Sequence, residues 1–91
     1  MVFAKQLREG IRRGEITRTV RIWQRCHVKV GGRYRMGDGH VVVTGILPMA
    51  LADISGSLAR QCGFKGVVDL LKIAKHGPGR NVFLIDFHYK K

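Results

Sequence analysis

The clearest alternation of apolar and polar positions runs from residue 14 to residue 23. In an extended chain, successive side chains point to opposite faces. One face is apolar except at one position and carries Ile16, Arg18, Val20 and Ile22. The other face carries Thr17, Thr19, Arg21 and Trp23. This second face suits an anionic or heteroaromatic ligand. An ordinary surface strand is the alternative, because Thr and Trp favour sheets and Arg favours the surface.

A helical period precedes this strand. Phe3, Leu7 and Ile11 recur at the spacing of one helix face, which predicts an amphipathic helix over residues 3–13. Gly14 follows directly and suits the left-handed conformation that ends many helices. We therefore expect the helix to lead into the strand through a tight turn, with its basic side close to the strand.

Turn residues divide the middle of the chain into short extended segments. Candidate strands lie at residues 27–30, 33–36 and 40–47. Residues 37–39, Gly-Asp-Gly, predict a hairpin-type turn between the last two. Gly45 indicates a β-bulge or the close approach of another backbone. Pro48 is expected to end the strand.

Two helices are expected before a last strand. Asp53 or Ser55 can cap a short helix that runs to about Cys62, with Gly63 ending it. A second amphipathic helix and an alternating last strand are expected at residues 66–76 and 82–89. This order predicts an α+β fold of one domain, residues 1–91. Its core is a small, mixed but mainly antiparallel β-barrel, with an N-terminal helix and two helices before the last strand.

Positive charge adds a functional prediction to this fold. Seventeen Lys and Arg residues stand against six Asp and Glu, which gives a formal net charge of +11. Such a chain attracts polyanions, usually RNA or DNA, although solubility alone is an alternative reason for the charge. Arg suits phosphate through its paired N–H donors. The candidate phosphate-binding residues are Arg8, Arg12, Arg18, Arg21, Arg25, Arg33 and Arg35.

Cysteine and histidine positions predict no metal site and no cofactor. Cys26 and Cys62 are far apart and outside any CxxC pattern, and the four His residues are scattered. Free thiols agree with a reducing compartment. No apolar run approaches the roughly 20 residues that span a bilayer, and charges interrupt the region where a signal peptide is apolar. We expect a soluble, cytoplasmic protein without a membrane partner, and the oligomeric state stays open.

Two further features could carry chemistry. Residues 77–80, Gly-Pro-Gly-Arg, could cradle a phosphate, but they lack the P-loop pattern and lead into a strand, which favours a plain turn. Asp86 lies inside the apolar last strand, where a carboxylate needs a partner. Arg21 is the partner that we expect. No nucleophile–base–acid arrangement stands out in the sequence.

The segment that opens the first strand resembles the motif of the ASCH domain, a branch of the PUA-like β-barrel superfold. In that family a helix precedes Gly-x-Lys-x-x-x-x-Arg on the first strand, and a small Gly-rich barrel and a Phe-rich last strand follow. Here the motif is Gly14-Glu15-Ile16-Thr17-Arg18-Thr19-Val20-Arg21. The resemblance implies a PUA-like barrel over nearly the whole chain, with a cleft that binds RNA or modified nucleosides.

Some ASCH proteins are amidohydrolases that act on acylated cytidine, and nuclease activity is reported for others. Gly14 and Arg21 match the family's Gly and Arg, and Thr19 matches the threonine that the amidohydrolases use. The family's lysine falls at Ile16, which cannot act as a base or bind an anion. Residues 58–64 contain no Glu to complete the catalytic set. The resemblance therefore implies binding more than catalysis, with Thr19 catalytic only if the protein is an enzyme.

Together these patterns predict a basic cleft next to the first strand that binds RNA, another nucleic acid or a modified nucleoside. The guanidinium groups would contact phosphates. An unstacked base or nucleoside would lie against Thr17, Thr19, Arg21, Trp23 and Tyr34. A hydrolase of RNA or of an acylated or modified nucleoside is the alternative. A third interpretation is a protein-interaction module whose basic surface is incidental.

Overall fold

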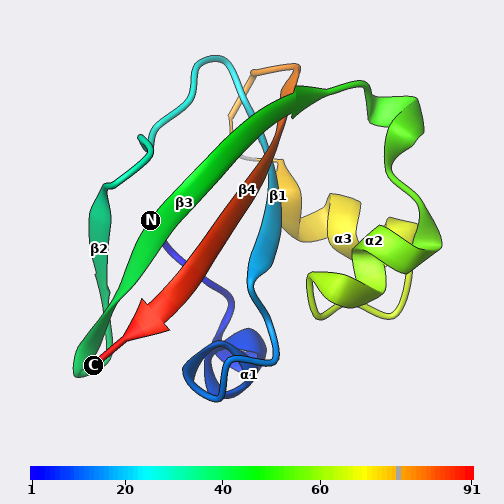
Figure 1. Ribbon diagram of the computed structural model, residues 1–91. Helices are drawn as coiled ribbons and strands as arrows, with labels where there is room; N and C mark the ends of the chain where they lie inside the picture. The colour runs from blue at the N-terminus through cyan, green and yellow to red at the C-terminus, as the bar shows by residue number, and fades with distance from the viewer. Residues whose placement is uncertain (76) are drawn as a thin grey trace.

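Four antiparallel strands form one sheet in the computed structural model, which describes residues 1–75 and 77–91 (Figure 1). The strands are β1 (Arg18–Trp23), β2 (Arg33–Met36), β3 (Gly39–Met49) and β4 (Asn81–Lys90). Their order across the sheet is β1-β4-β3-β2, so the first and last strands of the chain are neighbours. The sheet curls into a half-barrel, where the sequence predicted a small, mainly antiparallel barrel.

Short helical elements surround the sheet. They are the 3-10 turns η1 (Lys5–Leu7) and η2 (Leu51–Asp53), and the helices α1 (Arg8–Arg12), α2 (Gly56–Gln61) and α3 (Val67–Ala74). In Figure 1, α1 lies below the sheet, and α2 and α3 lie beside β1. No helix within the described residues has the length and apolar character needed to cross a bilayer.

The N-terminal helix is shorter than predicted. η1 and α1 replace the continuous helix expected at residues 3–13, and the weak helix former Gly10 lies within α1. The predicted apolar stripe is nevertheless confirmed, because Phe3, Leu7 and Ile11 are all buried. The chain leaves the helix through Gly14, whose φ of 78° confirms the left-handed turn.

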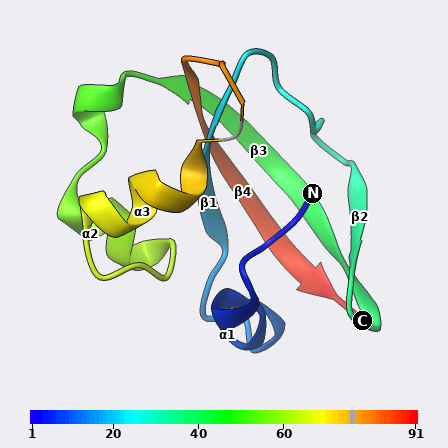
Figure 2. The same cartoon turned by 180° about the vertical axis from the view of Figure 1, so that it is seen from behind.

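Both faces of β1 are buried, which corrects the prediction of an exposed face. Val20 and Ile22 pack in a cluster with residues of α2 and α3. On the other face, Thr19 and Arg21 are each 6% exposed and Trp23 is 5% exposed. This second face is covered because the N-terminal segment, residues 1–4, crosses the sheet between α3 and β2 (Figure 2).

The long strand β3 confirms the bulge but continues past the proline. Val43 pairs with Phe87 and Gly45 with Asp86, so one extra residue lies between them. Pro48 does not end the strand, contrary to the prediction, since β3 continues to Met49. β2 pairs with β3 only as far as Val42. Proline is tolerated at residue 48 because β3 has a ladder partner on only one side there.

Other local predictions hold in part. Residues 27–30 form a loop and not a strand. Ser55 is the cap of α2, because its Oγ accepts the N–H of Leu58 at 3.1 Å, and Asp53 lies in η2 instead. Gly63 ends α2 with a φ of 92°, as predicted. α3 covers most of the helix expected at residues 66–76, of which residue 76 lies outside the described residues.

Candidate nucleic-acid interface

Arg21 is the most unusual residue of the predicted ligand face, because its guanidinium group is buried. Its Nη2 donates to the carbonyl oxygen of Val2 at 2.6 Å, and its Nε donates to Thr19 Oγ1 at 3.2 Å. Its Cζ lies 5.0 Å from the centre of the Phe3 ring, in a cation–π contact. Burial lowers the pKa of Arg21, since desolvation disfavours the charged form.

Arg21 does not pair with Asp86, so that prediction is wrong. Strand register explains the difference, because Arg18 lies opposite Asp86 whereas Arg21 lies opposite Phe83. Among the residues that the structure describes, no carboxylate lies within 4.0 Å of the Arg21 guanidinium. A buried cation without a carboxylate is costly. The Val2 carbonyl, the Thr19 hydroxyl and the Phe3 ring offset part of this cost.

A cavity of about 270 Å³ adjoins Arg21. Trp23 and His27 also line it, and Met1 and Val2 of the N-terminal segment complete its wall. The rings of Trp23 and His27 meet edge to face, with their centres 4.7 Å apart. Trp23 is therefore a packed wall residue, and not the open stacking surface expected from the sequence.

The other residues of the predicted cleft do not line this cavity, although Tyr34 packs against the core cluster that contains Trp23. Thr17 is exposed. Thr19 is buried and its hydroxyl accepts the hydrogen bond from Arg21. Tyr34 is half-buried, and its hydroxyl oxygen accepts a backbone N–H of the preceding loop at 3.1 Å. Of the five cleft residues proposed from the sequence, the structure brings only Arg21 and Trp23 to one cavity.

Arg18 is engaged on the opposite face of the sheet. Its Nε donates to Asp86 Oδ1 at 2.6 Å, and its Nη1 donates to Gln61 Oε1 at 3.2 Å. The hydrogen bond to Asp86 raises the pKa of Arg18. Both side chains of the ion pair are partly exposed, so the pair adds little to stability. Arg25, another predicted phosphate contact, is exposed in the loop after β1.

Three of the predicted phosphate-binding residues meet around the turn between β2 and β3. Arg8 of α1 and Arg35 of β2 line one cavity of about 250 Å³, together with Gly37. The guanidinium group of Arg12 lies over Gly37 as well. Within the described residues, Arg8 and Arg35 have no carboxylate within 4.0 Å, and Arg12 has only Glu9 at 3.8 Å. We call Arg8, Arg12 and Arg35 the basic corner.

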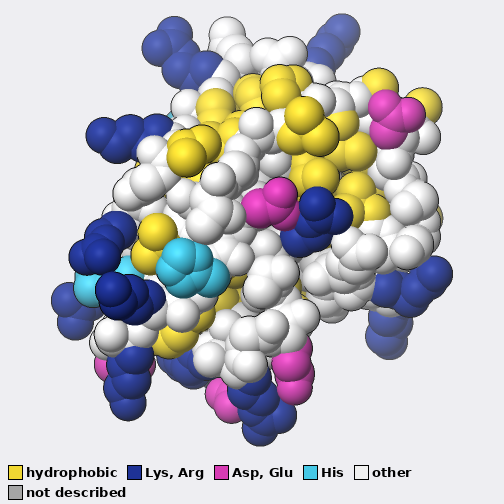
Figure 3. Space-filling view, in the orientation of Figure 1, with side chains coloured by type: hydrophobic (Ala, Val, Ile, Leu, Met, Phe, Trp, Pro, Cys, Tyr) yellow, Lys and Arg dark blue, Asp and Glu magenta, His cyan; other side chains and the backbone are white. Residues whose placement is uncertain are grey.

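The adjoining face of the sheet adds Arg, Lys and His side chains, most of them not predicted from the sequence. Register places five residues on one face, the basic sheet face: Arg33, Arg35, His40, His88 and Lys90. Across the ladder, Arg35 lies opposite His40, and His40 lies opposite Lys90. Figure 3 shows Lys, Arg and His side chains gathered along this side of the molecule. Polar residues alternate with apolar residues at the end of the last strand, and this alternation is the sequence pattern that could have predicted the basic sheet face.

The glycine loop before β4 has a structural explanation. Residues 77–80 form the turn between α3 and β4, as predicted. Gly79 is buried against the backbone of Trp23 and Gln24, and an added Cβ would lie closer than 3.0 Å to both. The glycine is thus required by the close contact of two backbone segments.

The two cysteines are expected to react with a thiol reagent at very different rates. Cys62 is 1% exposed, and burial raises its pKa to about 11. Below that pH its thiol stays protonated, and the thiolate is the reactive form. Cys26 is only half-buried. Near pH 8, peptide mapping after labelling should show Cys62 reacting at least about tenfold more slowly. Equal rates in the native protein would contradict this packing, and denaturant should remove the difference.

No three His, Cys, Asp or Glu side chains within the described part of the chain gather in a way that could hold a metal ion.

Comparison with protein families, with curated proteins and with solved structures finds no match to this chain. The ASCH resemblance therefore stays a prediction that rests on the motif at residues 14–21.

Proposed function

We propose that this protein binds RNA or another nucleic acid through the basic corner and the adjoining basic sheet face. The observation that carries the proposal is the convergence of Arg8, Arg12 and Arg35 on one turn. Guanidinium groups that surround one turn repel one another, and a phosphate bound among them would relieve the repulsion. The net charge of +11 attracts polyanions to the molecule over longer distances.

The Arg21 cavity is the second part of the proposed site. It lies beside β1, where the cleft was expected, and it shares Met1 and Val2 with the cavity of the basic corner. One ligand can therefore contact both parts, with phosphates at the basic corner and an anionic or nucleoside group near Arg21. We include the ASCH family and its PUA-like fold in this proposal, because the half-barrel and the Gly14–Arg21 spacing agree with them.

The hydrolase alternative receives no support from the position of its candidate nucleophile. Thr19 is 6% exposed, and its hydroxyl oxygen is occupied by the Arg21 Nε–H. Ile16, at the place of the family's lysine, is half-buried against the cluster that contains Phe3 and Leu7. The proposed function is therefore binding without catalysis.

The double variant Arg8→Gln/Arg35→Gln is expected to bind single-stranded RNA more weakly than the parent, by a factor of up to about ten. The expected loss follows from removing two charge-assisted contacts to phosphates. The slope of log K against log salt concentration should also become less steep by about 1.4, since each phosphate contact on a single strand contributes about 0.7. Fluorescence anisotropy titrations at several salt concentrations measure both quantities.

The matched control is Arg60→Gln/Arg80→Gln, which removes the same charge from two exposed positions outside the basic corner. This control should retain most of the affinity. Equal losses in the two double variants would show that bulk charge, and not the basic corner, attracts the RNA. A parent protein that binds no RNA at low salt would overturn the proposed function altogether.

A further inference from the structure

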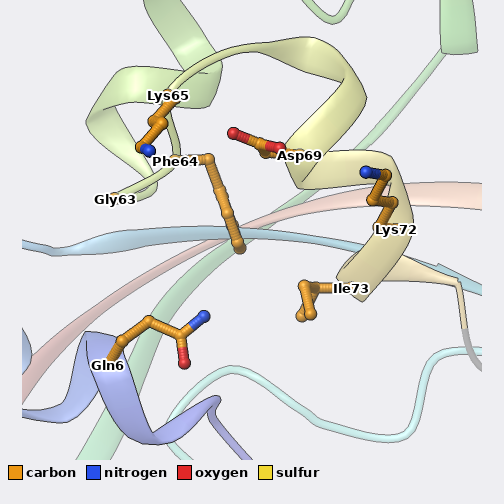
Figure 4. Close-up of a pocket in the computed structure, with 7 residues that line it drawn as sticks. All are labelled: Gln6, Gly63, Phe64, Lys65, Asp69, Lys72 and Ile73. Atoms are coloured by element: carbon orange, nitrogen blue, oxygen red, sulfur yellow. The ribbon is translucent and has the colours of Figure 1, made fainter.

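A cavity of about 260 Å³ lies between η1 and the loop that joins α2 to α3 (Figure 4). The ring of Phe64 points into it from the loop, and the Gln6 side chain points toward it from η1. Lys65 and Lys72 place their amino groups at its rim, with Asp69 between them. An aromatic ring, an amide and two cations thus surround one opening.

The rim of this cavity is positively charged. Lys65 and Lys72 are both exposed, whereas Asp69 is half-buried. Among the described residues, Asp69 forms no ion pair within 4.0 Å with either lysine. The two amino groups are therefore available to an anionic ligand. We take this ligand to be the phosphate of a nucleic acid, because the net positive charge of the protein attracts polyanions.

Further cavities continue from this one toward Arg21. The next cavity, of about 320 Å³, shares Lys72 and Ile73 with it and is also lined by Lys75 and Val2. Val2 in turn lines the cavity beside Arg21. The middle cavity lies between α3 and the N-terminal segment, and it joins the Phe64 cavity at one end to the Arg21 cavity, on the β1 side, at the other. Figure 2 shows α3 and the N-terminal segment on the same side of the sheet. We call this series of cavities the α3 groove.

The lining of the α3 groove includes exposed apolar side chains. Val2 is 73% exposed and Ile73 is 39% exposed, although both side chains are large and apolar. Surfaces that bind single-stranded nucleic acid combine a line of cations for the backbone with aromatic rings on which bases stack. A duplex keeps its bases paired and stacked, so it cannot place a base on the Phe64 ring.

We propose that the α3 groove binds single-stranded nucleic acid. One base would stack on Phe64, Gln6 would hydrogen-bond to its edge, and phosphates would follow Lys65, Lys72 and Lys75 toward Arg21. This inference rests on the proposed function and adds two properties to it: the single-stranded form of the ligand and the path that the strand follows. The basic corner would then bind the phosphates beyond the N-terminal segment.

The first test is Phe64→Leu with a labelled RNA single strand of about twelve nucleotides. Leu keeps the residue apolar where Phe64 packs against two clusters of the core. The affinity for the single strand should fall about tenfold, in line with the loss of one base–aromatic stack. The affinity for a duplex of the same length, which the parent should bind more weakly, should stay unchanged. Circular dichroism and a thermal transition like the parent's would show that the variant folds.

The second test changes only exposed side chains and does not depend on core packing. Lys65→Gln/Lys72→Gln should reduce the salt slope for the single strand by about 1.4. The matched control Lys29→Gln/Arg80→Gln, at two exposed positions outside the groove, should leave the slope close to the parent's. Removing two phosphate contacts should lower the affinity several-fold more than removing two distant charges.

The outcomes separate this inference from the proposed function. Phe64→Leu and Lys65→Gln/Lys72→Gln binding the single strand as tightly as the parent would overturn the α3 groove. Preference of the parent for duplex over single strand would overturn it as well. In both cases the Arg8→Gln/Arg35→Gln result still decides on the basic corner. A parent that binds neither form would overturn both proposals.

Discussion

Gly79→Ala is expected to destabilise the protein by about 3 kcal/mol or more, because its added Cβ would lie closer to backbone atoms than at any other glycine. The added Cβ would overlap the main chain at Trp23 and Gln24, where β1 ends. A clashing side chain can change rotamer, but two backbone segments must move apart. Here that movement would pull the β4 side of the turn away from β1, its neighbour in the sheet.

Chemical denaturation followed by circular dichroism measures this effect. The matched control is Gly66→Ala, because an added Cβ there meets no atom within 4 Å and the backbone is extended, with φ of −172°. The control should change the free energy of unfolding by less than about 1 kcal/mol. Unfolding of Gly79→Ala at the same denaturant concentration as the parent would show that the two backbones are not in close contact.

Arg21→Ala is expected to lower the free energy of unfolding by about 2–4 kcal/mol. The substitution would leave a cavity beside Phe3, and it would leave the Val2 carbonyl and the Thr19 hydroxyl without their donor. Arg21→Met should recover most of this loss. A long apolar side chain refills the space next to the Phe3 ring, and it removes the cost of burying a charge.

The Met variant also separates folding from ligand binding. Weaker RNA binding by Arg21→Ala or Trp23→Ala could reflect unfolding, because both residues are buried. Arg21→Met should keep the fold and still bind RNA about tenfold more weakly, since the charge that faces the cavity is gone. RNA binding at the parent's level by a stable Arg21→Met would remove the Arg21 cavity from the proposed site. Its failure to fold would show that the guanidinium is needed for structure.

Local sequence patterns predicted most elements because their causes are local. The i, i+4 spacing of Phe3, Leu7 and Ile11 defines a helix face, and glycine is the cheapest residue in the left-handed conformation of Gly14 and Gly63. The bulge near Gly45 was also predictable from the residue type. Ends of elements were less predictable, because Gly10 weakened the first helix and the free edge of β3 accommodated Pro48.

The alternation in β1 showed which residues share a face and left open what covers each face. The face with Thr19, Arg21 and Trp23 became interior because the N-terminal segment folds back over it. That contact joins residues about twenty positions apart. No periodicity within a single strand contains such information.

The sequence alone set the positive charge, the α+β order of elements and the alternating faces of β1, because these follow from residue types and short spacings. Only the tertiary structure decided which cation meets which partner. The β1–β4 register placed Asp86 opposite Arg18, with which it forms an ion pair, and left Arg21 buried without a carboxylate. The position of α1 beside the β2–β3 turn brought Arg8 and Arg35 to one cavity and Arg12 over Gly37. Each of these contacts depends on strand register and on long-range packing, which place residues side by side whatever their distance along the chain.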